Sequence, residues 1–176
     1  SMKDGEHFTK ISGKENESAI TKHTFSDYNG NGEIIVKLSD IKLNGKNIQF
    51  DDYEFNEDES KLLFTTQTTS IYRHSYTAVY YLYDIQTKTI QTLDDVHQPQ
   101  TLAEYSPDGT KVSFIHKNNL YVKDLTNGKV KQLTEDGKNN KIINGTTDWV
   151  YEEEFAITKA YCWSPDSKNL AFLKFD

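Results

Sequence analysis

A pattern of about ten residues recurs along the chain and limits its fold more than any other feature of the sequence. Each copy has an aromatic residue, a turn similar to Ser-Pro-Asp-Gly, and then an alternating apolar strand. Three copies are clear and a fourth is weaker: Phe55–Phe64, Tyr105–Phe114, Trp163–Phe172 and Lys3–Phe8. The aligned aspartates are Asp4, Asp58, Asp108 and Asp166, which lie 54, 50 and 58 residues apart. This spacing predicts several copies of one small structural unit.

The residues of the repeat favour a tight turn that leads into a strand. In the Tyr105 copy, Pro107 fixes φ, Asp108 can accept hydrogen bonds from nearby amides, and Gly109 accepts a positive φ. Two of the copies are followed by two short strand patterns with polar turn residues between them. These patterns predict hairpins over residues 80–93 and 119–134.

Repeats of about 50 residues with about four short strands each are typical of β-propeller blades. We therefore predict an all-β fold that forms part of a propeller. An ordinary all-β sandwich with coincidental turns is the alternative. No segment has the apolar spacing of a long amphipathic helix, and the best candidate for a short helix is Val150–Phe155.

Composition excludes several classes of protein. The 176 residues include 27 Asp and Glu against 20 Lys and Arg, a net charge of −7 that argues against a nucleic-acid-binding surface. Aromatic residues make up 12% of the chain, which argues against disorder, and no apolar run is long enough for a membrane-spanning helix. The single cysteine, Cys162, excludes an intrachain disulfide, and its neighbours Tyr161 and Trp163 predict a buried, inert thiol.

Motifs for catalysis, cofactors and metals are missing from the sequence. There is no Gly-x-Ser-x-Gly motif, no phosphate-binding glycine loop, and no pair of His or Cys residues at metal-ligand spacing. The five histidines do not cluster with a nucleophile in the sequence. We therefore predict no catalytic residues, no cofactor and no metal site within this chain.

Two local segments are better candidates for binding. In Asp148–Phe155, three consecutive glutamates lie beside aromatic residues that we expect to hold the segment in place. Most charge runs are solvated surface, but two fixed carboxylates can accept all three hydrogens of a primary ammonium. In Ser70–Ala78, Arg73 lies among aromatic and β-branched residues. It is either an ordinary surface arginine or a planar donor for a carbonyl or carboxylate oxygen.

These segments resemble the dipeptidyl peptidase IV family of prolyl oligopeptidase-type enzymes. The resemblance rests on Thr147–Phe155 with Trp163–Asp166, on Arg73–Ala78 with Tyr83–Ile85, and on Asn119–Lys123 and Ile143–Trp149. It covers most of the chain from about residue 50 to the end. It implies about three four-stranded blades of an eight-bladed propeller. It also implies that the acidic segment is a short helix that projects from a blade into the active-site cavity.

The resemblance implies roles for individual residues. By position, Glu153 and Glu154 match the pair that binds the free N-terminal ammonium of a peptide substrate. Arg73 matches the arginine that binds the carbonyl oxygen of the second-last residue before the cut. Glu152 matches an acidic residue that the family does not use for this contact, so we expect Glu153 to tolerate Gln or Ala less well than Glu152.

The resemblance also implies a larger protein. The family's serine, aspartate and histidine triad lies in a C-terminal α/β-hydrolase domain, which this sequence does not contain. We expect the chain to be a fragment that is inactive alone, from a serine-type exopeptidase that releases Xaa-Pro dipeptides. Within it we expect an incomplete first repeat over 1–54, a blade over 55–104, a blade with the Glu-Glu insertion over 105–162, and the start of the next blade over 163–176.

Expectations about partners and cellular location follow from the same reasoning. The expected partners are a peptide with a free amino terminus and the hydrolase domain, and the cut propeller edges are expected to self-associate. The lack of cysteine pairs favours a bacterial protein that is periplasmic, secreted or on the cell surface. The alternative function is a non-catalytic propeller that serves as a protein-binding platform.

Overall fold

The structure is a computed structural model that describes residues 1–13, 17–27 and 30–176. Three antiparallel sheets contain most of its strands. The first has the order β1 (His7–Ser12), β2 (Ala19–Thr24), β3 (Glu33–Lys37). The second has the order β6 (Asp52–Phe55), β7 (Lys61–Ser70), β8 (Tyr76–Asp84), β9 (Thr89–Thr92). The third has the order β10 (Thr101–Tyr105), β11 (Lys111–His116), β12 (Asn119–Asp124), β13 (Val130–Gln132).

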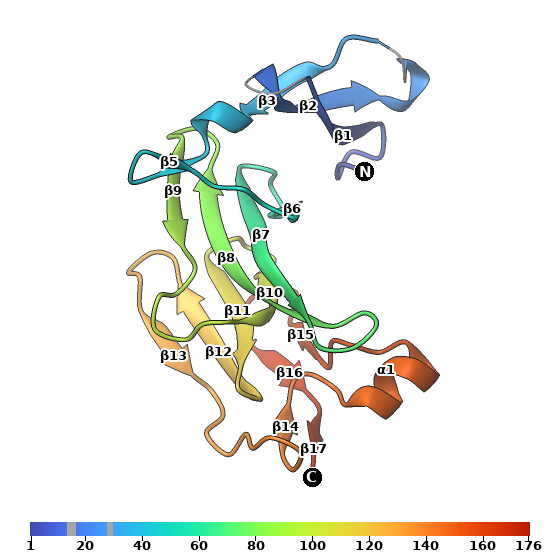
Figure 1. Cartoon of the computed structure of the whole chain (residues 1–176), viewed down its shortest axis with the longest axis vertical. Coiled ribbons are helices and arrows are strands. Elements are labelled where there is room, and N and C mark those ends of the chain that lie inside the picture. The colour runs from blue at the N-terminus through green and yellow to red at the C-terminus, as the bar shows by residue number, and fades with distance from the viewer. Residues whose placement is uncertain (14–16, 28–29) are drawn as a thin grey trace.

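Smaller elements connect and follow these sheets. Short two-stranded pairs join β4 (Lys42–Leu43) to β5 (Lys46–Asn47), β14 (Ile143–Asn144) to β17 (Lys174–Phe175), and β15 (Tyr161–Trp163) to β16 (Leu170–Phe172). Within the described residues there is one α-helix, α1 (Trp149–Phe155), and there are 3-10 turns at Phe25–Asp27 and Leu38–Asp40. The sheets follow one another in chain order along an arc, as Figure 1 shows.

The sheets are held together face to face by apolar side chains. In β7, Leu62 and Phe64 pack into a cluster shared with the first sheet, whereas Leu63 packs into a cluster shared with the third sheet. This alternation follows from the strand geometry, in which successive side chains point to opposite faces. The next cluster joins Ile115 of β11 to Tyr161 of β15. Strand β7 is therefore buried on both faces, as expected for a central strand between two stacked sheets.

The repeated aspartates form the turns that the sequence predicts. Asp108 accepts hydrogen bonds from the amide of Thr110 at 3.0 Å and from the hydroxyl of Ser106 at 2.6 Å, and Gly109 has a φ of +66°. Asp4, Asp58 and Asp166 accept the matching bonds from the amides two residues ahead of them. These turns therefore share one hydrogen-bonding pattern, which explains why the same residue types recur.

Several sequence predictions are confirmed. The all-β class is correct, strands β8 and β9 and strands β12 and β13 form the two predicted hairpins, and the helix predicted at Val150–Phe155 is α1. The number of blades and their boundaries stay predictions.

The prediction for Cys162 is wrong, because its side chain is exposed. Cys162 lies in the middle of β15, between the buried Tyr161 and the half-buried Trp163. In a strand, alternate side chains face opposite ways, so the burial of both neighbours directs the thiol outward.

Candidate functional site

Helix α1 lies in an insertion between strands β14 and β15. Its base is closed by an antiparallel bridge between Thr146 and Lys159 and by a hydrogen bond of 2.6 Å from the Thr147 hydroxyl to the carbonyl of Ile157. Strand β14, which pairs with β17, precedes this closed base, and strand β15, which pairs with β16, follows it. The helix is therefore a projection from the last group of strands and not a part of their hydrogen-bonded ladder.

The ends of α1 are set by specific residues. The side chain of Asp148 accepts a hydrogen bond of 3.1 Å from the amide of Tyr151, which caps the N-terminus. The helix stops at Ala156, whose φ of 54° is left-handed and whose amide donates to the carbonyl of Glu152. A helix of seven residues is too short to be stable alone, so its position depends on contacts with the rest of the molecule.

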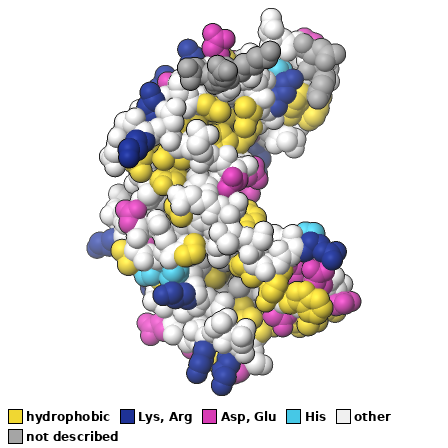
Figure 2. All heavy atoms as spheres, viewed as in Figure 1, with side chains coloured by type: hydrophobic (Ala, Val, Ile, Leu, Met, Phe, Trp, Pro, Cys, Tyr) yellow, Lys and Arg dark blue, Asp and Glu magenta, His cyan; other side chains and the backbone are white. Residues whose placement is uncertain are grey.

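The aromatic residues of α1 hold it less firmly than the sequence predicts. Trp149 is 52% exposed and Phe155 is 63% exposed, so neither packs into a core. Tyr151 stacks in a tilted arrangement on Phe175, with ring centroids 4.7 Å apart. Hydrophobic and acidic side chains consequently lie beside one another on the surface over α1 (Figure 2). The prediction that the aromatic flank pins the carboxylates is wrong for Trp149 and Phe155.

The hairpin of β7 and β8 extends beyond its sheet to reach this helix. The register of the two strands shifts between Thr66 and Thr69, and Gln67 adopts a φ of +51° at this bulge. The Asp51 carboxylate accepts hydrogen bonds from the amide and the hydroxyl of Thr68, at 3.1 and 2.9 Å. Asp51 thereby fixes the bulge from which the outer part of the hairpin leaves the sheet.

The tip of the hairpin meets α1 through Glu152. The tip closes with a hydrogen bond of 2.8 Å from the amide of Ile71 to the carbonyl of Ser75. Glu152 is 2% exposed, and its Oε1 atom accepts hydrogen bonds from the amides of His74 and Ser75, at 2.6 and 3.1 Å. Burial raises the pKa of this carboxyl, but the hydrogen bonds from Ser75 and His74 outweigh burial and hold the pKa below its ordinary value. Glu152 is therefore ionised at neutral pH.

Two of the three predicted binding residues are in contact, and the third lies on the same helix as one of them. Arg73, at the tip of the hairpin, forms an ion pair with Glu153 of α1, and their nitrogen and oxygen atoms are 3.3 Å apart. The Arg73 side chain is 70% exposed, whereas that of Glu153 is 17% exposed. An ion pair with so much solvent access contributes about 0–1 kcal/mol. Glu154 is exposed on the same helix, and its side chain forms no ion pair or hydrogen bond with any other described residue.

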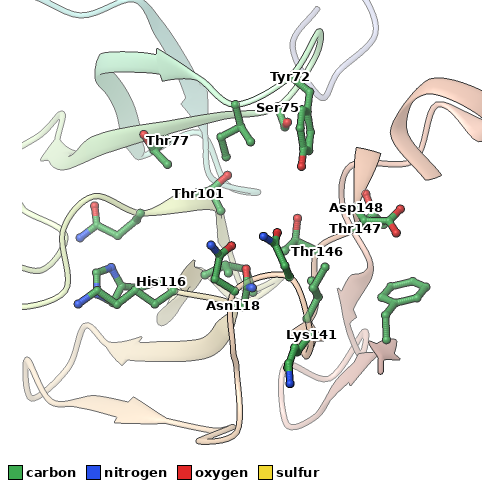
Figure 3. Close-up of a pocket in the computed structure, with 18 of the residues that line it drawn as sticks. Tyr72, Ser75, Thr77, Thr101, His116, Asn118, Lys141, Thr146, Thr147 and Asp148 are labelled. Carbon is green, nitrogen blue, oxygen red and sulfur yellow. The ribbon is translucent and has the colours of Figure 1, made fainter. Parts of the chain in front are cut away.

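A cavity of about 630 Å³ lies next to this group of residues. Figure 3 shows Tyr72 and Ser75 of the hairpin above it, Thr147 and Asp148 at the entry to α1 beside it, and His116 below. Arg73, Glu153 and Glu154 do not line the cavity, but Arg73 directly follows Tyr72, which does, and Asp148, which caps α1, also lines it. A molecule held by the charged residues could therefore extend past Tyr72 and Asp148 into the cavity.

Metal-binding clusters and membrane-spanning helices are both absent from the residues that the structure describes. In the described part of the chain, no group of three or more His, Cys, Asp or Glu side chains is arranged to hold a metal ion. None of the described helices is long and apolar enough to cross a membrane.

Comparison with known proteins assigns the family. The family model for the N-terminal region of dipeptidyl peptidase IV matches residues 56–176. The chain belongs to this dipeptidyl peptidase IV family. The family that the Asp148–Phe155 and Arg73–Ala78 segments predict is thus confirmed.

Individual members of the dipeptidyl peptidase IV family are similar over most of the chain. Dipeptidyl peptidase 4 of Bos taurus is 35% identical over 148 residues, which is 84% of this chain and 19% of the relative. Prolyl endopeptidase FAP of Bos taurus is 34% identical over 168 residues, which is 94% of this chain and 22% of the relative. The chain thus spans about a fifth of the length of these relatives.

A solved structure of the same family has the same fold. The crystal structure of Porphyromonas gingivalis dipeptidyl peptidase 4 superposes with a TM-score of 0.87 at 34% identity. The match covers 99% of this chain and 24% of that one. The expected all-β, partial-propeller fold is confirmed by this match, and the similar proteins named here are peptidases.

Sequence reasoning brought Arg73, Glu153 and Glu154 to attention but missed the contacts of Glu152. Its bonds to His74 and Ser75 join residues 78 and 77 positions apart in the chain. Three adjacent glutamates look alike in a sequence. Only the direction of each side chain around the helix distinguishes the buried one from its exposed neighbour.

Proposed function

We propose that this chain is the segment of a dipeptidyl peptidase IV-like serine exopeptidase that binds the free amino terminus of peptide substrates and limits access to the active site. The whole protein then releases N-terminal dipeptides of the Xaa-Pro type. The observation that supports this proposal best is the meeting of Arg73, on the hairpin, with Glu153, on helix α1. The family assignment supports it further.

The charges of these side chains suit a peptide amino terminus. An α-ammonium group has an ordinary pKa of about 7.7–8.0 and a glutamate one of about 4.3, so both groups are charged between these values. Glu153 and Glu154 together provide enough oxygen lone pairs for the three hydrogens of the ammonium. The guanidinium of Arg73 has five N–H donors, so its pairing with Glu153 leaves donors for a substrate carbonyl oxygen.

Binding at the amino terminus explains why such an enzyme removes dipeptides. A site that holds the ammonium fixes the number of residues between it and the bond that is cut. The cut itself needs the serine, aspartate and histidine of the α/β-hydrolase domain, which we propose as the partner of this segment. The 176-residue chain is then inactive by itself.

Kinetics of the whole protein test the proposal. We expect a chromogenic Xaa-Pro substrate with a free amino group to be cleaved, and the same substrate with an acetylated amino group to be refused. Glu153→Ala and Arg73→Ala should each raise KM at least about tenfold, since each removes a charge-assisted contact. Glu135→Gln, which removes one exposed carboxylate elsewhere, is the matched control.

Two results would contradict the proposal. One is equal cleavage of the free and the acetylated substrate by the wild-type protein. The other is an unchanged KM in Glu153→Ala. A whole protein that binds peptides without cleaving them would instead favour the protein-binding platform.

A further inference from the structure

Glu152 differs from the two glutamates that follow it. It is buried, whereas Glu154 is exposed, and its carboxylate points to the backbone of the hairpin. The residues that it contacts follow Arg73 directly, and Glu152 itself precedes Glu153 directly. The two hydrogen bonds of Glu152 and the ion pair of Arg73 therefore lie side by side between the same two elements.

We propose that Glu152 is a positioning residue, whose carboxylate fixes the tip of the β7–β8 hairpin against helix α1 so that Arg73 and Glu153 face one another. The contacts of Glu152 with the hairpin are the basis for this positioning role. Its consequence for substrate binding rests on the proposed function of Arg73 and Glu153.

Few polar contacts join the described hairpin tip to helix α1. Among the described residues, the hydrogen bonds and ion pairs that join the tip to α1 are the two bonds of Glu152 and the pair of Arg73 with Glu153. The Arg73 side chain is largely exposed, so salt and water weaken its attraction to Glu153. The ring of Tyr151 contacts Phe175 of β17, which is not part of the hairpin. The buried Glu152 carboxylate, which accepts two hydrogen bonds, therefore joins the hairpin to the helix more strongly than the exposed ion pair does.

A single oxygen atom of Glu152 forms both bonds. Oε1 accepts from the amide of His74 and from the amide of Ser75. A glutamine carbonyl oxygen in the same place can accept the same two bonds, although without the extra strength of a charged acceptor. A direct contact with a substrate ammonium, in contrast, requires the negative charge. Glu152→Gln therefore separates a positioning role from a binding role.

The experiment compares Glu152→Gln and Glu152→Ala in the whole protein, with Glu135→Gln as the control for the loss of one carboxylate. Hydrogen–deuterium exchange of the peptide covering residues 71–76 reports the order of the hairpin tip, and steady-state kinetics report KM and kcat. Glu152→Ala should speed exchange at His74 and Ser75 and raise KM, each about tenfold, with kcat changed less than about threefold. Glu152→Gln should stay within about threefold of wild type in both measurements.

Specific results overturn the proposal. Unchanged exchange at the tip in folded Glu152→Ala shows that the carboxylate does not hold the hairpin. A Glu152→Gln protein with wild-type exchange but the KM of Glu152→Ala shows a direct contact of the charge with substrate. Glu152→Asp is measured alongside, because its shorter side chain withdraws the oxygen from the amides and should show the same changes even where Glu152→Ala does not fold. An unchanged KM in Glu153→Ala, together with faster exchange in Glu152→Ala, overturns the proposed function and leaves the positioning role intact.

Discussion

Removal of the cap of helix α1 should loosen the candidate site without unfolding the sheets. The change is Asp148→Ala, which deletes the acceptor of the 3.1 Å hydrogen bond from the amide of Tyr151. Loss of such a cap costs about 1 kcal/mol, within a range of about 0.5–2 kcal/mol. Because α1 has seven residues and little stability of its own, this cost falls on the local equilibrium between the ordered and the open insertion.

The expected magnitude follows from that cost. About 1 kcal/mol corresponds to about a fivefold rise in the population of the open insertion. The base of the insertion stays closed by the Thr146–Lys159 bridge, so the melting temperature of the sheets should not change. The assay is hydrogen–deuterium exchange of the peptide covering residues 149–156, beside a thermal unfolding curve. Asp148→Asn is the matched control, since asparagine caps a helix about as well as aspartate does.

The outcome distinguishes the cap from the charge of Asp148. We expect faster exchange in Asp148→Ala and nearly wild-type exchange in Asp148→Asn. Equal increases in the two variants would assign the effect to the lost charge near the helix N-terminus instead of the lost hydrogen bond. No increase in either variant would show that packing of Tyr151 on Phe175 is enough to order α1, and would refute the reasoning.

Three other expectations concern the sheets. Phe114→Ala, which empties the core between the second and third sheets, should lower the free energy of unfolding by about 3–5 kcal/mol in urea titrations, and a loss below about 1 kcal/mol would contradict the stacked arrangement. A hydrogen bond from the amide of Glu6 lowers the pKa of Asp4 to about 2, and hydrogen bonds from Ser106 and Thr110 hold the pKa of Asp108 well below its usual range. Both aspartates should therefore add stability above about pH 4 that is lost progressively as the pH falls below that value. Asp108→Asn should flatten that fall in urea midpoints measured against pH. The 176-residue chain expressed alone should self-associate through exposed strand edges, and light scattering that finds a monomer at all concentrations would contradict this.

The parts of the fold that sequence predicts are those that local chemistry determines. The turn at Asp108 combines a proline, an acceptor and a glycine within a few residues, so the sequence predicts it directly. The hairpin of β12 and β13 is similar, because its strands are neighbours in the chain. Helix α1 can also be predicted from the sequence, because Asp148 provides a capping side chain just before it.

The parts that sequence does not predict depend on contacts between distant residues. Cys162 is exposed because its side chain lies on the outward face of β15. Its neighbours Tyr161 and Trp163 do not reveal this until the faces of the strand are known. The extension of the β7–β8 hairpin depends on the bulge at Gln67, which Asp51 fixes from outside the strand. No short motif contains this information.

The run of three glutamates therefore has two kinds of residue in it. Glu153 and Glu154 are less buried than Glu152, and in the proposed function they act through their charge. Glu152 is buried against backbone amides, and its identity matters through the position of one oxygen atom. A substitution that keeps the oxygen but removes the charge should therefore be tolerated at Glu152 and harmful at Glu153. That contrast follows from the burial and the two hydrogen bonds of Glu152 and from the proposed role of Glu153, and it predicts that adjacent, chemically identical residues respond in opposite ways to the same replacement by glutamine.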